Sequence, residues 1–143
     1  MIPKPAFVRS LAFVILLCAI GVRGQTRERV HLNQNAFAFA ARLINEGHVI
    51  ADNKGAWAKD QPSAEVENEF IRRHGFGEYA KWHLGIDERY AENTKRRYKF
   101  PYGDFKNVHR CGVLAVQSRA GEYRYSAIEN AAAQLRQTIE ATR

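Results

Sequence analysis

The clearest pattern in this chain lies in residues 104–139, DFKNVHRCGVLAVQSRAGEYRYSAIENAAAQLRQTI. In its first half, apolar residues recur every three or four positions, which predicts a helix over 105–120 with Asp104 as its N-cap. In its second half, Ser126 and Glu129 form a capping box that opens a last helix. The two helices are joined by a short link, so we expect them to pack as an antiparallel hairpin. The apolar stripe of the last helix consists of Ile128, Ala131, Ala132, Leu135 and Ile139.

Outward from that hairpin, the chain divides into shorter helices separated by Gly, Pro and polar breaks. Residues 33–46 carry apolar side chains at helical spacing, and Ser63 is the N-cap of a second helix that ends before Gly75. A third helix is predicted over 78–84. Residues 48–51 are too short to assign and form a strand or an extended link. The expected fold is therefore mainly α, a single small domain of about four to five short helices.

The chain has 143 residues and a formal net charge of +7, enough for one modest hydrophobic core. Lys4 and Arg9 precede an apolar run that ends near Gly24, which predicts a secretory signal peptide over 1–24 and a domain over 25–143. We therefore expect a secreted or periplasmic protein. The apolar run is shorter than the ~20 residues of a spanning helix, so we expect no permanent membrane anchor. A misplaced start site, with a cytoplasmic protein, is the alternative.

Cationic and aromatic side chains are interleaved within residues 94–112, TKRRYKFPYGDFKNVHRCG, called the basic-aromatic segment below. Cationic groups beside flat rings suit a partner that is anionic and able to stack. We therefore expect this segment to bind an anionic partner, whether nucleic acid, an acidic protein face or an envelope polymer. The candidate binding residues are Lys95, Arg96, Arg97, Tyr98, Lys99, Phe100, Tyr102, Lys106 and Arg110.

Two other interpretations stay open. Aromatic rings around a Pro–Gly turn often fill a core, in which case the cations solvate a loop and the domain acts through protein contacts elsewhere or in an oligomer. Alternatively, the chain is a small hydrolase or nuclease with His83, Asp104 and His109 as its candidate catalytic residues. For His83, beside Trp82, a bond to a backbone carbonyl is favoured over metal binding.

The sequence contains no template for catalysis, phosphate binding or a metal site. The five histidines form no HExxH pair, no cysteines stand at zinc-finger spacing, and GxSxG, GxGxxG and P-loop patterns are missing. Once a leader is removed, Cys111 is the one remaining cysteine, so we expect no intramolecular disulfide. Its place in a predicted helix favours a small buried residue over a catalytic thiol. We expect neither a cofactor nor a metal ion.

The chain also resembles a family of small uncharacterised bacterial and archaeal proteins, over about residues 31–139. The string YKFPYGDF is the most specific part of the likeness. The resemblance implies a helical single domain and assigns no activity, cofactor or catalytic residue. Members of that family begin near the position of His31 without a secretory leader, which keeps the start-site alternative open. The matching strings are QPS at 61–63, YAKWHLGID at 79–87, TK at 94–95, RYKFPYGDF at 97–105, VHR at 108–110, and IE with AA at 128–132.

Overall fold

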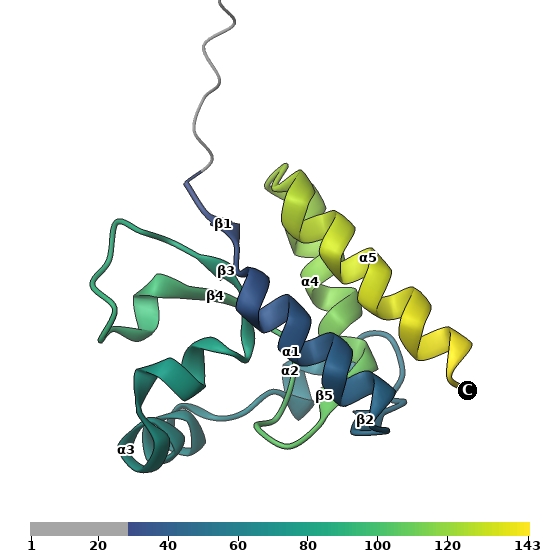
Figure 1. Cartoon of the computed structure of the whole chain (residues 1–143), viewed down its shortest axis with the longest axis horizontal. Coiled ribbons are helices and arrows are strands. Elements are labelled where there is room, and N and C mark those ends of the chain that lie inside the picture. The colour runs from purple at the N-terminus through teal and green to yellow at the C-terminus, as the bar shows by residue number, and fades with distance from the viewer. Residues whose placement is uncertain (1–28) are drawn as a thin grey trace, which may run out of the picture.

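The computed structural model describes residues 29–143, so the predicted signal peptide over 1–24 lies outside the described residues. These residues form a mainly helical small domain with short strands (Figure 1). Among residues 29–143, no helix is both long and apolar enough to cross a membrane. The elements are β1 His31–Leu32, α1 Gln34–Asn45, β2 Val49–Ile50, α2 Trp57–Asp60, α3 Ala64–Ala80, β3 His83–Ile86, a 3₁₀ turn Lys95–Arg97, β4 Tyr98–Pro101, β5 Val108–His109, α4 Arg110–Glu122 and α5 Ser126–Ala141.

Two small sheets connect segments that are far apart in the sequence. In the first, β3 lies between β1 and β4 and pairs antiparallel with both. In the second, β2 and β5 pair in parallel, with Val49 opposite Val108 and Ile50 opposite His109. Parallel strands end at the same edge, so the residues that follow β2 and β5 meet in space.

The start of α1 is held by Asn33, whose side chain uses both of its polar ends. Its Oδ1 accepts a hydrogen bond from the backbone N of Ala36 at 3.2 Å, as an N-cap does. Its Nδ2 donates to the carbonyls of Ala80 and His83, at 3.0 and 3.1 Å. Asn33 therefore joins α1 to the end of α3 and the start of β3.

The core lies where α5 packs against α4 and α1. In Figure 1, α5 and α3 lie on opposite sides of the molecule, with α1 and the strands between them. The predicted apolar stripe of α5 is buried, and α4 and α5 pack together across a link of Tyr123–Tyr125, as the sequence indicated. Tyr102 fills the other end of the core, fully buried, and its hydroxyl donates to the Lys81 carbonyl at 2.6 Å.

Three predicted helix boundaries are wrong. The predicted helix over 78–84 ends at Ala80, because residues 83–86 form β3 and pair with strands on both sides. The predicted helix over 105–120 begins only at Arg110. Asp104 does not cap it: the Asp104 side chain accepts from the backbone N of Lys106 and Asn107, which closes a turn in front of β5. Ser126 lies inside α5 instead of at its N-cap.

The predicted helix from Ser63 is confirmed, although it runs further than expected. The Ser63 hydroxyl accepts from the backbone N of Val66, so the cap is present. Helical residues continue to Ala80 across a kink at Gly75, which has φ 79° and ψ 172°. Gly75 therefore bends the segment at the predicted break, since glycine adopts a positive φ without strain.

Candidate functional site

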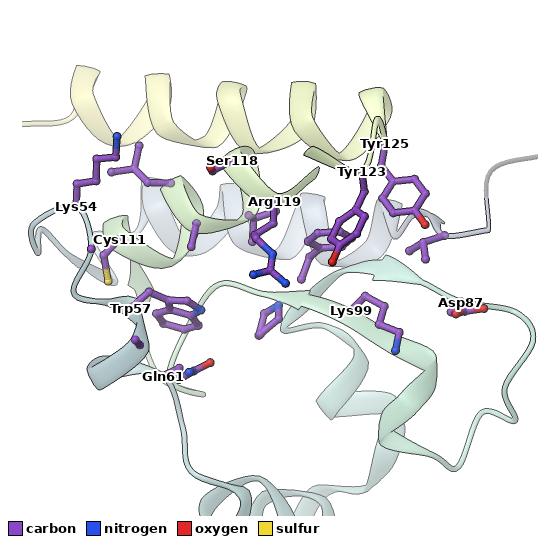
Figure 2. A pocket seen from close by; sticks show the side chains of 18 of the residues that line it. Lys54, Trp57, Gln61, Asp87, Lys99, Cys111, Ser118, Arg119, Tyr123 and Tyr125 are labelled. Carbon is purple, nitrogen blue, oxygen red and sulfur yellow. The ribbon is translucent and has the colours of Figure 1, made fainter. Parts of the chain in front are cut away.

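A pocket of about 850 Å³ lies between α4 and β4. The region of α2 borders it at one end and the turn between α4 and α5 at the other. Figure 2 shows Arg119 extending from α4 toward β4, and Lys99 on the opposite wall. Its aromatic lining comes from three separate regions of the chain: Trp57 of α2, Phe100 of β4, and Tyr123 and Tyr125 of the turn before α5.

Phe100 enters the pocket wall through an unusual backbone conformation. Its φ of 61° is in the left-handed region, which a residue with a side chain rarely adopts. The ring lies over Gly85, where a Cβ would come within 2.7 Å of the ring edge, so only glycine leaves this space free. With this twist, Lys99, Phe100 and Pro101 all line the pocket. A regular strand would send neighbouring side chains to opposite faces.

The charged groups of the pocket are mostly cationic. Among residues 29–143, one carboxylate lines it, that of Asp87, and Arg89 binds both oxygens of that carboxylate at 2.8 and 2.6 Å. These hydrogen bonds lower the pKa of Asp87 to about 2. The other lining cations, Lys54, Lys99 and Arg119, make no ion pair with a carboxylate of residues 29–143. A ligand in this pocket therefore meets uncompensated positive charge.

A second group of polar side chains, called the Asp–His–Cys cluster below, lies at the α2 end of the pocket. It consists of Asp52, Asp60, Asp104, His109 and Cys111. His109 Nδ1 lies 2.6 Å from Asp52 Oδ2, and its Nε2 lies 3.0 Å from Asp104 Oδ2. Cys111 donates to Asp52 twice, from its backbone N at 2.7 Å and from its Sγ at 2.9 Å. Cys111 also lines the pocket, so the two features share a wall.

The parallel pairing of β2 with β5 builds this cluster. Asp52 follows the end of β2 by two residues, and Cys111 follows the end of β5 by two residues. Because Ile50 and His109 are opposite each other, the Asp52 carboxylate reaches the first turn of α4. There it accepts a hydrogen bond from the backbone N–H of Cys111, which has no acceptor within the first turn of the helix. A side chain distant in sequence thus supplies the cap that Asp104 was expected to provide.

The hydrogen bonds of the cluster define its protonation. A carboxylate only accepts, so a His109 bonded to two carboxylates donates from both ring nitrogens and carries a positive charge. Burial alone would lower the pKa of His109, but the hydrogen bonds to Asp104 and Asp52 offset this and raise it. Burial, together with the neighbouring Asp52, raises the pKa of Cys111 to about 12. Cys111 is therefore a thiol at neutral pH and a poor nucleophile.

The three candidate catalytic residues do not form one centre. Asp104 and His109 are bonded to each other, while His83 is 2% exposed and its Nδ1 lies 2.9 Å from the carbonyl of Tyr79. This is the backbone bond expected for His83, and Trp82 beside it is buried as well. His109 has both nitrogens engaged, so it offers no free position for proton transfer to a substrate.

The residues of the basic-aromatic segment point in several directions. Three of its cations bind groups within the protein: Lys95 contacts Glu67 at 2.8 Å, Arg97 donates to the Tyr90 carbonyl, and Arg110 contacts Glu140 at 3.5 Å. Arg96 and Lys106 are exposed, and Arg96 lies over the Tyr90 ring.

Its aromatic rings are divided in the same way. Tyr102 is fully buried, and Tyr98 is half-buried against the rings of Tyr79 and Phe76. Phe105 stacks on Phe70 with ring centroids 4.2 Å apart. Lys99 and Phe100 are the candidate binding residues of the segment that line the pocket.

Several residues of the pocket were not predicted from the sequence. Trp57, Arg119, Tyr123 and Tyr125 lie outside the basic-aromatic segment, and only the fold brings them to one pocket. A partial signal for the cluster was present, since Asp104 and His109 are both among the candidate catalytic residues predicted from the sequence. Comparisons of the chain with protein-family models, with curated proteins and with solved structures gave no match.

Proposed function

We propose that this protein binds a small anionic ligand with an aromatic or apolar body, in the pocket between α4 and β4. The observation that carries the proposal is the excess of positive charge in an otherwise apolar, aromatic pocket. Four cationic side chains line the pocket among the described residues, and its one carboxylate is already neutralised by Arg89. Binding pockets for small molecules combine apolar walls with a few convergent polar groups in this way.

Each part of such a ligand has a matching part of the pocket. The flat body would pack between Trp57, Phe100 and the two tyrosines, since aromatic rings offer large contact areas with little entropy to lose. The anionic group, a carboxylate, sulfonate or phosphate, would bind Arg119 and Lys99. The Arg119 guanidinium lies 5.7 Å from the centre of the Tyr123 ring, so it already stacks on one aromatic face. An arginine in that position binds planar anions with two donors.

The anionic partner expected from the basic-aromatic segment is thus proposed to be a small molecule. A polymer such as nucleic acid would need a continuous cationic surface with exposed rings. The internal contacts of Lys95, Arg97 and Arg110 and the burial of Tyr102 favour the pocket instead.

A matched pair of fluorescent probes tests the proposal. 1-Anilinonaphthalene-8-sulfonate is aromatic and anionic, and N-phenyl-1-naphthylamine has the same rings without the sulfonate. We expect the sulfonate to bind more tightly. We expect Arg119→Gln to weaken its binding by about tenfold and to leave the neutral probe unchanged, since a hydrogen bond to a charged group contributes about 1.5–3 kcal/mol and Arg119 remains exposed.

Lysine variants supply the control. Lys99→Gln removes a cation that lines the pocket, and Lys106→Gln removes an exposed cation of the same segment outside the pocket. Only the first should weaken sulfonate binding. Equal affinity for the two probes, or equal effects of the two lysine variants, would exclude the pocket as an anion site.

A further inference from the structure

We propose that Asp52, Asp60, His109 and Cys111 bind a divalent transition-metal ion, with Zn²⁺ as the preferred ion, and that Asp104 positions His109 for it. Each of the four residues offers one ligand atom, and these atoms all lie within 4.8 Å of one another. They come from the loop after β2, the end of α2, the end of β5 and the first turn of α4. This proposal is independent of the ligand proposed for the pocket.

The distances fit an ion after small side-chain movements. Tetrahedral zinc, with bonds of about 2.0 Å to N and O and about 2.3 Å to S, separates its ligand atoms by about 3.3–3.7 Å. At present His109 Nδ1 and Cys111 Sγ lie 2.6 and 2.9 Å from Asp52 Oδ2, because hydrogen bonds hold them together. An ion would replace the protons of these bonds and move the atoms apart by less than about 1 Å.

The Asp60 carboxylate has no role in the hydrogen bonds that cap α4. This carboxylate is partly buried, and it takes part in no hydrogen bond or ion pair in the part of the chain that the structure describes. Asp52 caps α4 and binds His109 without help from Asp60. A metal ion would use the free Asp60 carboxylate and offset the charge of two acids near a buried thiol.

Asp104 supplies the outer carboxylate that histidine ligands of metals usually have. A ligating His donates its other ring N–H to a carboxylate or carbonyl, which fixes the ring and its tautomer. His109 has this arrangement, with Nε2 bonded to Asp104 Oδ2 at 3.0 Å and Nδ1 directed at the cluster. The Trp57 ring lies beside the imidazole, with the two ring centroids 5.8 Å apart.

The donor set also selects the ion. One nitrogen, one sulfur and two oxygens suit Zn²⁺ and its neighbours in the first transition series. Mg²⁺ and Ca²⁺ take oxygen ligands and are disfavoured by a thiolate. The site would join the 52–60 segment to α4. Because Lys54 and Trp57 belong to that segment, it would also fix one wall of the pocket.

The test uses the full chain with Cys18→Ser, so that Cys111 is its only thiol. After treatment with chelator, Co²⁺ is added and the absorption spectrum is recorded. We expect a thiolate-to-cobalt charge-transfer band that saturates at one ion per chain. Zn²⁺ should abolish the band by displacement, and Mg²⁺ should leave it unchanged.

Two variants decide whether the cluster is the site. Cys111→Ser should abolish the band. Asp60→Asn should weaken Zn²⁺ binding by at least about tenfold without loss of the fold, since Asp60 lies outside the hydrogen-bond network. Glu122→Gln, an exposed acid on α4, is the control and should bind as the parent does. The absence of a Cys111-dependent band, or equal Zn²⁺ affinity in Asp60→Asn and the control, would overturn the proposal. If Cys111→Ser does not fold, the Asp60→Asn comparison alone decides.

Discussion

His83 is a buried titratable side chain outside the pocket and the Asp–His–Cys cluster. Burial, only partly offset by the Tyr79 carbonyl and the charge of Glu67, lowers its pKa to about 4. Below the ordinary histidine pKa of 6.5, the unfolded chain therefore binds a proton that the folded chain does not bind. By linkage, folding loses stability as the pH falls from about 6.5 to about 4.

We expect His83→Asn to remove this dependence. Its amide can donate to the Tyr79 carbonyl as Nδ1 does, but it does not titrate. The stability difference between wild type and variant should change by up to about 3 kcal/mol across this pH window, at 1.36 kcal/mol per pH unit. Urea unfolding at a series of pH values measures it. His48→Asn, at an exposed histidine, is the control. If the stability of His83→Asn changed with pH in the same way as that of the wild type, His83 would not be the source of the pH dependence.

At the level of elements, α4 contacts its neighbours very differently at its two ends. A Cβ on Gly112 would lie 2.7 Å from the Tyr102 carbonyl oxygen and 3.0 Å from the Trp57 ring. The backbone of α4 therefore approaches the chain after β4 as closely as glycine permits. The three heavy atoms nearest to a Cβ on Gly121 all belong to the end of the Glu129 side chain, the nearest at 3.0 Å, and that side chain can move.

The same substitution should consequently have opposite effects at the two positions. Gly112→Ala should destabilise the protein by about 1–3 kcal/mol, because backbone atoms cannot move aside without strain. Gly121→Ala should be neutral or stabilise it by up to about 1 kcal/mol, through the better helix propensity of alanine. Denaturant unfolding of both variants provides the measurement. Destabilisation of similar size at both sites would show that helix context, not the contact with Tyr102, sets the cost.

For the whole molecule, α1 connects α5 to the group of aromatic rings around Trp82. α5 packs against α1, α4 and β1, and α1 in turn contacts Trp82 through the edge-to-face ring of Phe39. We expect the domain to unfold as one cooperative unit, because buried residues of α1, β3, α4 and α5 belong to one hydrophobic core.

Leu135→Ala tests this cooperativity, since Leu135 is buried in α5 and contributes neither to the pocket nor to the cluster. The loss of the isopropyl group should lower the free energy of unfolding by about 2–5 kcal/mol. Tryptophan fluorescence, from Trp57 and Trp82, and far-ultraviolet circular dichroism should shift to the same lower midpoint. Gln134→Ala, an exposed neighbour, should change stability by less than about 0.5 kcal/mol. Separate midpoints for the two signals would contradict a single cooperative unit.

Sequence alone was sufficient for much of the helical framework, because the signals of helix caps, breaks and apolar stripes are local. The cap at Ser63, the break at Gly75 and the apolar stripe from Ile128 to Ile139 depend on neighbours three or four positions away. It was also sufficient to recognise that cations and rings are concentrated in one segment. It did not predict the strand over 83–86, whose few residues are extended because chain-distant partners hydrogen-bond them on both sides.

The pocket and the cluster were decided by tertiary structure. Asp52 reaches Cys111 because β2 pairs in parallel with β5, and no short-range pattern encodes a contact between residues so far apart in the chain. Likewise, Arg119 and Lys99 line the same pocket because α4 packs against β4. Helices form through interactions between residues within about one turn of each other. The pocket and the cluster form only when segments far apart in the chain come together, which happens when the whole core packs.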